Sequence, residues 1–217
     1  MNVTLLINRY FDDERADTNI DVFDSSNIYD VYQRVINVLN RNTEIEISIM
    51  QAMSYCFYEI LDNVITHSTK NLGTVLSCFN AQKHWLRVLI ADEGIGIHKS
   101  LSENEKYKNI SEKEALLSCI KDSVTDGKGM GFGLYSTSLL IRNTGLRFEI
   151  HSGNHKLVYR NNKIEVEESD FWQGTVVFME LNTDKEINPN DIVANRTDCA
   201  EQFNETFLNN SELEELW

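Results

Sequence analysis

The segment GKGMGFGLY, residues 127–135, constrains the fold more than any other part of this sequence. It places glycine at alternate positions, Gly127, Gly129, Gly131 and Gly133, directly before a stretch with helical apolar spacing. Glycine loses more backbone entropy on folding than any other residue, so such a run persists where no side chain fits or where φ must be positive. We therefore expect something to approach this backbone closely.

The composition favours one globular domain and a cytoplasmic protein. The chain has 217 residues, 41% of them apolar, which is enough to bury a core. A formal net charge of -14 without clustered Lys and Arg argues against nucleic-acid binding. We expect no membrane contact, because no apolar run reaches membrane-spanning length and the N-terminus lacks signal-peptide features. The single cysteines, which form no CxxC pair and are expected to be small core residues, are Cys56, Cys78, Cys119 and Cys199.

Hydrophobic periodicity and capping residues predict the order of elements. In the first half we expect a strand at residues 3–9, helices at 25–41 and from Thr43 to about His67, and antiparallel strands at 73–81 and 84–92. Thr43 and Glu46 have the spacing of a capping box. In the second half we expect one short helix at 111–123 with a Ser111–Glu114 capping box, a helix at 130–145 ending on Gly145, and a meander of strands at 146–153, 156–160, 162–169 and 174–181.

This order predicts an α+β protein. We expect residues 1–182 to form a two-layer sandwich, with a mostly antiparallel sheet and helices packed on one of its faces. The polar connection at residues 97–128 is long for a compact domain and is expected to be a lid. Residues 183–217 form an acidic tail in which Phe203, Phe207 and Leu208 fit one helical stripe. The tail either docks on its own domain as a partly helical terminus or binds a partner.

The helix expected to end near His67 carries the first candidate site residues. Its buried stripe is Met53, Phe57, Ile60 and Val64. Glu59, Asn63 and His67 follow at four-residue steps on an adjacent line. A carboxylate and an amide one turn apart could activate a nucleophile and hold Mg²⁺ through oxygen, although such pairs are commonly solvated helix surface. His67 could simply interact with the C-terminal helix dipole.

The second candidate is LIADEGIGI, where an apolar strand ends at Asp92 and is followed by Gly94 and Gly96. A carboxylate at a strand end suits hydrogen bonding to an exocyclic amine, and bare backbone beside it allows a flat ring to approach. An ordinary D-x-G turn has the same pattern. The third candidate is the glycine run itself, because amides at a helix N-terminus bind anions and Lys128 adds a positive charge. The spacing fits neither a P-loop nor a dinucleotide-binding fingerprint.

The combination of these motifs in order is more specific than any one of them. ExxxN, DxGxGI, a polar lid, GxGxGL and a late strand that begins with GT at Thr175 resemble the Bergerat ATP-binding fold over residues 1–181. This superfamily includes gyrase, a heat-shock chaperone, histidine kinases and mismatch-repair ATPases. The resemblance implies that ATP and Mg²⁺ are bound. It also implies a two-layer sandwich of the Bergerat type with a mixed, mostly antiparallel sheet.

The resemblance assigns roles to individual residues. Glu59 would be the general base, Asn63 would coordinate Mg²⁺, and Asp92, supported by Thr175, would accept a hydrogen bond from the adenine amino group. The remaining nucleotide-binding positions that it implies are Gly94, Gly96, Ile97, Lys128, Gly129, Gly131, Gly133 and Leu134. The metal and the helix amides would neutralise the nucleotide locally in an acidic protein.

The sequence also restricts which member of the superfamily this is. No His is followed by an acidic residue as in the phosphoacceptor of sensor kinases, and the tail is too short for the transducer domain of gyrase-like members. The Glu59 and Asn63 arrangement is most similar to anti-sigma-factor serine kinases. We expect transfer of phosphate to Ser or Thr of a small partner, either anti-sigma-antagonist-like or sigma-factor-like, and a homodimer is possible. The alternatives are an ATP-gated binding module with little phosphotransfer, or an ATPase coupled to conformational change.

Overall fold

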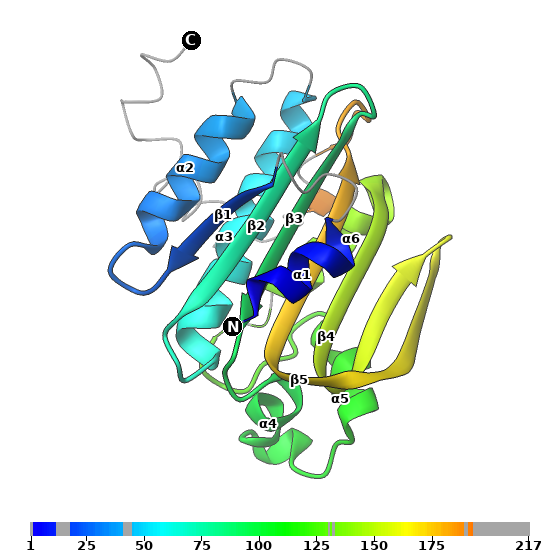
Figure 1. Ribbon diagram of the computed structural model, residues 1–217. Helices are drawn as coiled ribbons and strands as arrows, with labels where there is room; N and C mark the ends of the chain where they lie inside the picture. Colours follow the sequence, from blue (N-terminus) through cyan, green and yellow to red (C-terminus); the bar gives the residue numbers. More distant parts are fainter. Residues whose placement is uncertain are drawn as a thin grey trace.

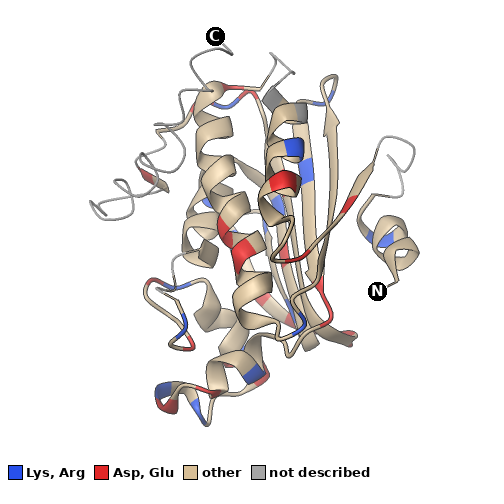
Figure 2. Cartoon of the chain, turned by 90° about the vertical axis from the view of Figure 1, so that its left-hand side faces the viewer, with Lys and Arg blue, Asp and Glu red and all other residues tan. Residues whose placement is uncertain are grey.

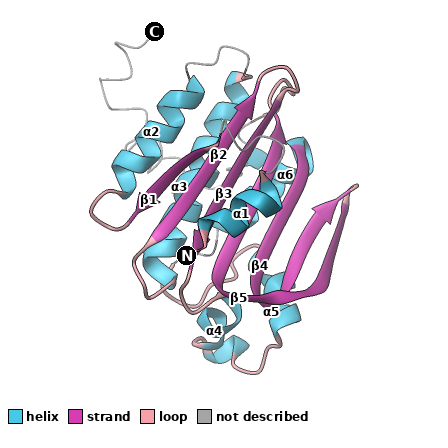
Figure 3. Ribbon diagram, in the orientation of Figure 1, coloured by secondary structure: helices cyan, strands magenta, loops and turns pink. Residues whose placement is uncertain are grey.

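A computed structural model describes residues 2–11, 18–40, 45–129, 131, 133–188 and 191–192. The elements in chain order are α1 (Val3–Tyr10), β1 (Asn19–Phe23), α2 (Ile28–Asn40), α3 (Ile47–His67), β2 (Gly73–Asn80), β3 (Trp85–Asp92), α4 (Ile97–Ser102), the 3-10 helix η2 (Glu105–Tyr107), α5 (Glu112–Cys119), α6 (Gly133–Thr144), β4 (Gly145–Arg160) and β5 (Lys163–Asn182). Figure 3 shows helices and strands in separate layers, which confirms the expected α+β sandwich.

The sheet has five strands in the order β1-β2-β3-β5-β4, and every neighbouring pair is antiparallel. β2 and β3 form the predicted hairpin, with Gly73 opposite Asp92. Their side chains are almost all buried, because helices cover both faces at the centre of the sheet. β3 is the central strand of the sheet (Figure 1). Asp92 is its last residue, so it lies midway across the sheet, at one end of the strands.

α2, α3 and α6 form the main helical layer on one face of the sheet (Figure 1). α3 lies in the middle of this layer, and its predicted stripe is buried: Met53, Phe57, Ile60 and Val64 are at most 5% exposed. Burying side chains of this size contributes about 1.5–3 kcal/mol each. α3 is therefore fixed against the sheet, and the residues on its adjacent line, including Glu59 and Asn63, have fixed positions at the edge of the core.

The prediction of a strand at residues 3–9 is wrong, because this segment forms α1. Val3, Leu5 and Ile7 alternate as in a strand, but Leu5 is exposed, and the residues that pack on the sheet follow helical spacing: Val3, Leu6, Ile7, Tyr10 and Phe11. The side chain of Asn2 caps the helix by accepting a hydrogen bond from the Leu5 amide. α1 lies on the opposite face of the sheet from the other helices, as Figure 2 shows near the N-terminus.

One of the two predicted capping boxes is present. Ser111 and Glu114 cap α5 reciprocally, with the Ser111 amide 3.0 Å from the Glu114 carboxylate. The prediction that α3 begins with a Thr43–Glu46 box is wrong, since α3 begins at Ile47 and Glu46 makes no side-chain cap. Thr43 lies outside the described residues. The Glu46 amide instead donates to the Thr183 carbonyl, so a tertiary contact replaces the expected local one.

The predicted four-strand meander is also wrong, because β4 and β5 form one long hairpin. Gly153 and Gly174, at the ends of two predicted strands, lie instead where the pairing of β4 with β5 is irregular. Gly153 has φ of 67° and Gly174 has φ of 91°, and the register between the strands shifts at Gly153. Such bulges bend the strands without ending them. The bend at Gly174 lies beside Asp92, next to the candidate site.

The expected lid at residues 97–128 contains α4, η2 and α5, more structure than the one predicted helix. Within the described part of the chain, no helix is both long and apolar enough to cross a membrane. Cys56, Cys78 and Cys119 are buried, as predicted for small core residues, and Cys199 lies outside the described residues. The stripe of Phe203, Phe207 and Leu208 also lies outside them.

Candidate functional site

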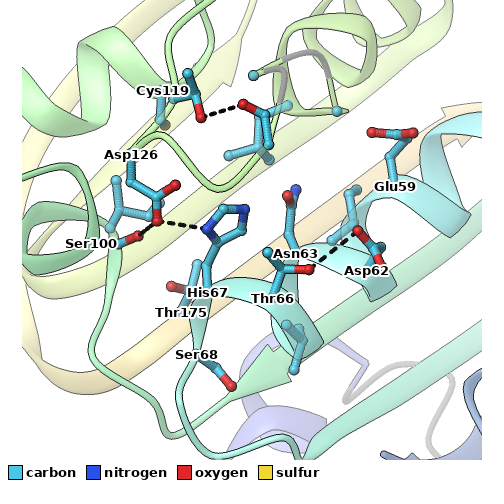
Figure 4. Close-up of a pocket in the computed structure, with 18 of the residues that line it drawn as sticks. Glu59, Asp62, Asn63, Thr66, His67, Ser68, Ser100, Cys119, Asp126 and Thr175 are labelled. Atoms are coloured by element: carbon cyan, nitrogen blue, oxygen red, sulfur yellow. Dashed lines mark hydrogen bonds and ion pairs between the residues drawn. The ribbon is translucent and has the colours of Figure 1, made fainter. Parts of the chain in front are cut away.

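A cavity of about 340 Å³ lies between α3, the end of β3, the lid and the start of α6. It brings together motifs that are far apart in the sequence. The predicted site residues that line it are Glu59, Asn63, Asp92, Gly96, Ile97, Lys128, Gly129, Gly131, Gly133, Leu134 and Thr175. Gly94 is the one predicted residue that does not line the cavity. Figure 4 shows part of this site, with the side chains of α3 on one side and those of the lid on the other.

Glu59 and Asn63 lie one turn apart on α3 and face the cavity. Both also contact the beginning of α6. A Cβ atom added to Gly133 would lie 3.0 Å from the Glu59 Cβ and 3.2 Å from the Asn63 Nδ2. The absence of a side chain at Gly133 therefore lets the N-terminus of α6 approach α3, which places its amide end beside a carboxylate and a side-chain amide.

Asp92 is 4% exposed and forms the inner end of the cavity. Its Oδ1 accepts a hydrogen bond of 2.7 Å from the Gly94 amide. Burial raises the pKa of this carboxyl to about 6, and hydrogen bonds from the amides of Gly94 and Thr175 oppose that increase. At neutral pH the group is mainly an ionised acceptor in an apolar environment, which is suited to binding a polarised N–H donor.

The glycines after Asp92 are required by the protein's own packing. A side chain on Gly94 would collide with the backbone of Ser68, which follows α3. Gly96 has φ of 78°, and a side chain there would approach the Ser152 Oγ to 2.7 Å. These glycines let the turn pass between α3 and β4, so they shape the site even where, as at Gly94, they do not face the cavity.

The glycines of the run differ in how closely other atoms of the protein approach them. Gly131 has φ of 75°, and an added Cβ would collide with the Val124 backbone, so the fold itself requires glycine there. An added Cβ would meet nothing within 4 Å at Gly127, and only the His67 Nε2 at 3.8 Å at Gly129. The close approach expected from the sequence is therefore made by the protein itself at Gly131 and Gly133, while Gly127 and Gly129 face open space.

Asp126 is a central residue of the site that the sequence analysis missed. Its side chain is fully buried, and its Oδ2 lies 2.7 Å from the His67 Nδ1 and accepts from the Ser100 Oγ at 2.7 Å. Its Oδ1 accepts from the Lys128 amide at 3.0 Å. Burial acts to raise the pKa of Asp126, but these hydrogen bonds and His67 outweigh it, so the pKa is lowered. Figure 4 shows Asp126 joining α3 to the lid.

Lys128 lines the cavity with its ammonium group directed to a carboxylate of the lid. Its Nζ lies 2.8 Å from Glu103 and 3.9 Å from Asp126. The exposed pair with Glu103 raises the pKa of Lys128. An anion in the cavity would therefore compete with Glu103 for this charge, and exposed ion pairs of this kind are exchanged at little energetic cost.

The site is suited to a metal ion that takes most of its ligands from a bound nucleotide and water and only one or two from the protein. Among the residues that the structure describes, no group of three or more His, Cys, Asp or Glu could hold a metal ion. Glu59 and Asn63 nevertheless provide neighbouring oxygen atoms on α3. Mg²⁺ commonly binds through one or two protein side chains together with phosphate oxygens and water. The donor set fits Mg²⁺ delivered with a nucleotide.

The comparison with known families agrees with this geometry. The family model described as Histidine kinase-, DNA gyrase B-, and HSP90-like ATPase matches residues 50–185, more than half of the chain. The match begins within α3 and extends past the end of β5, so it covers every residue predicted for the site. No curated protein matches the chain. The chain belongs to the family of histidine kinase-, DNA gyrase B- and HSP90-like ATPases, and its matched region is their ATP-binding domain.

Proposed function

We propose that this protein binds Mg-ATP and transfers phosphate to Ser or Thr of a small protein partner, in the manner of anti-sigma-factor kinases. The observation that supports this most strongly is the pairing of Glu59 with Asn63 on α3, beside the N-terminus of α6. This pairing would combine a proton acceptor, a metal ligand and the N-terminal amides of α6 at one end of the cavity. The partner we favour is anti-sigma-antagonist-like or sigma-factor-like.

The two ends of the cavity fit the two ends of ATP. Asp92 and Thr175 at the inner end would bind the adenine amino group. Asn63 and the open backbone at Gly129 would face the phosphates. Mg²⁺ would be held by Asn63 and the phosphates, and when bound it would supply neutralising charge in a protein whose net charge is -14.

Glu59 would be the proton acceptor. It lies at the cavity wall beside Gly133 at the start of α6, and the proposal requires that a hydroxyl brought by a partner reach it there. As the hydroxyl oxygen bonds to the γ-phosphorus and the bond to the β,γ-bridging oxygen breaks, the hydroxyl proton would pass to Glu59 and ADP would leave. General-base assistance of this kind contributes about 10²–10⁴-fold to the rate.

The test is transfer of radiolabelled phosphate from ATP to a purified anti-sigma-antagonist-like domain. Glu59→Gln should slow labelling by about 10²-fold or more with little change in ATP affinity. Asp62→Asn is the matched control, because Asp62 is an exposed acid on the same turn of α3 and also lines the cavity. Equal labelling by wild type and Glu59→Gln would exclude Glu59 as the base.

A second candidate function is an ATP-gated binding module or ATPase switch. The network around Asp126 favours it, because this network joins the lid to α3 within the cavity wall and would be rearranged by bound phosphates. Tight ATP binding without a phosphorylated partner would support a binding module. Steady ADP release that is lost in Glu59→Ala would support an ATPase.

A further inference from the structure

The Asp92 turn, residues 92–97, is held from outside the cavity by consecutive residues of β5. The indole Nε1 of Trp172 donates to the Asp92 carbonyl at 3.1 Å. The side-chain amide of Gln173 donates to the Gly94 carbonyl. Both donors act on main-chain oxygens, one of Asp92 itself and one of Gly94, two residues later. They fix the backbone and do not occupy the carboxylate.

The bulge in the β4–β5 hairpin makes these contacts possible. Ser152 pairs with Thr175, and the next pair is Gly153 with Trp172, so Gln173 and Gly174 are additional residues on β5. The Ser152 hydroxyl donates to the Gly174 carbonyl at 2.8 Å and accepts from the Ile97 amide at 3.0 Å. Gly174 must be glycine, because its φ is 91° and a Cβ would collide with Asp92. The bulge thus presses against the turn and directs two donors to it.

Trp172 is itself held in place from the other face of the sheet. Its ring packs against the cluster of apolar residues beneath α1, and its centroid lies 6.2 Å from that of His151. The Nε2 of His151 is fixed by the Asp170 carbonyl at 2.7 Å. A donor with so little freedom defines the position of the carbonyl that it binds.

We infer that Trp172 and Gln173 are positioning residues that set the orientation of the Asp92 carboxylate and thereby determine how strongly the site selects a purine with a 6-amino group. The inference rests on the proposed binding of adenine by Asp92. A carboxylate that is free to rotate would still attract a nucleotide, but it would lose the directional hydrogen bond that separates amino purines from other purines.

The test measures dissociation constants for Mg-ATP and for the Mg complex of purine riboside triphosphate, which lacks the 6-amino group. Wild type should prefer ATP by about tenfold or more, as expected for a hydrogen bond to a charged acceptor. Trp172→Phe combined with Gln173→Leu removes both donors and keeps most of the packing. We expect the preference for ATP to fall by about three- to tenfold, with affinity for the other nucleotide nearly constant.

The controls separate positioning from general loss of structure. Trp85→Phe changes another tryptophan of the same apolar cluster, at the opposite end of β3 from Asp92, and should leave the preference unchanged. Gln173→Leu alone changes an exposed residue, and it is the variant to be measured if the double variant does not fold. An unchanged preference in folded Gln173→Leu and in the double variant would overturn the inference. If wild type bound neither nucleotide, the proposed function would fail instead.

Discussion

The two ends of the cavity are built differently. At the inner end, main-chain atoms of the Asp92 turn are held by hydrogen bonds that Trp172 and Gln173 donate and by one that Ser152 accepts from the Ile97 amide. At the outer end, the glycine run, residues 127–133, is joined to the rest of the protein by side-chain pairs such as Asp126 with His67 and Lys128 with Glu103. The first arrangement is rigid, whereas the exposed Lys128–Glu103 pair of the second can be exchanged for other charged contacts. Under the proposed function, the fixed end would bind the base, and the adjustable end would bind the phosphates and let the lid respond to them.

The largest effect should come from removing the acceptor at the rigid end. Asp92→Ala is expected to weaken Mg-ATP binding by about 10- to 100-fold, because hydrogen bonds to charged groups contribute about 1.5–3 kcal/mol. Isothermal titration calorimetry measures this directly. Glu93→Ala, at the exposed neighbouring position, is the matched control. Unchanged affinity in Asp92→Ala would remove the basis for the contrast between the two ends.

The rigid end should also show a characteristic pH dependence. The pKa of Asp92 is raised to about 6, so the carboxylate is mainly ionised above this pH and mainly protonated below it. Between about pH 7 and about pH 5, ATP affinity should fall by about tenfold if only the ionised form binds well. The ATP affinity of Asp92→Asn should not show this fall. It should keep only the pH dependence that comes from titration of the phosphates. Parallel profiles for the two proteins would show that Asp92 does not titrate in binding.

At the adjustable end, the glycines should fall into two classes by the effect of their substitution on the free energy of unfolding. Gly131→Ala places a side chain at positive φ against the Val124 backbone, so it should lower the free energy of unfolding by about 1 kcal/mol or more. Gly129→Ala meets only an ordinary contact with His67, so its effect on stability should stay within about 0.5 kcal/mol. Urea unfolding of both variants tests this. Equal losses would mean that the run is a uniform structural element.

The smallest effect should come from loosening the network around Asp126. Asp126→Asn weakens the charge-assisted contacts with His67 and Ser100. We expect faster amide hydrogen exchange in residues 97–131, by about threefold to tenfold, while amides of the Asp92 turn keep their protection except where they directly contact the lid. Asp122→Asn changes an exposed acid of the same loop and is the control. Equal acceleration at both ends would show that they open together.

The sequence predicted the parts of the fold that depend on local signals. The buried stripe of α3, the β2–β3 hairpin and the Ser111 cap all follow from periodicity or from capping chemistry, and all are present. α1 was predicted as a strand, because in eight residues an alternating pattern and a helical one share most of their apolar positions. The sheet face that Leu6 and Tyr10 pack against decides between them, and that face is assembled from distant segments.

The site was predicted where each motif has its own sequence pattern, and missed where its residues act through tertiary contacts. Glu59, Asn63, Asp92 and the glycine run were identified from spacing, and the structure places all of them except Gly127 around one cavity. Asp126 was not identified, because DGKG reads as an ordinary turn until folding brings it to His67. Trp172 and Gln173 were likewise hidden, since the bulge that directs them to the Asp92 turn depends on long-range pairing of β4 with β5.

The most direct test is a crystal structure with Mg²⁺ and a non-hydrolysable ATP analogue. We expect the adenine amino nitrogen to lie within hydrogen-bonding distance of the Asp92 carboxylate, with Mg²⁺ at Asn63 and the phosphates beside Gly129. A base bound away from Asp92, or a cavity that is closed by the protein's own side chains while the analogue binds elsewhere, would contradict this assignment.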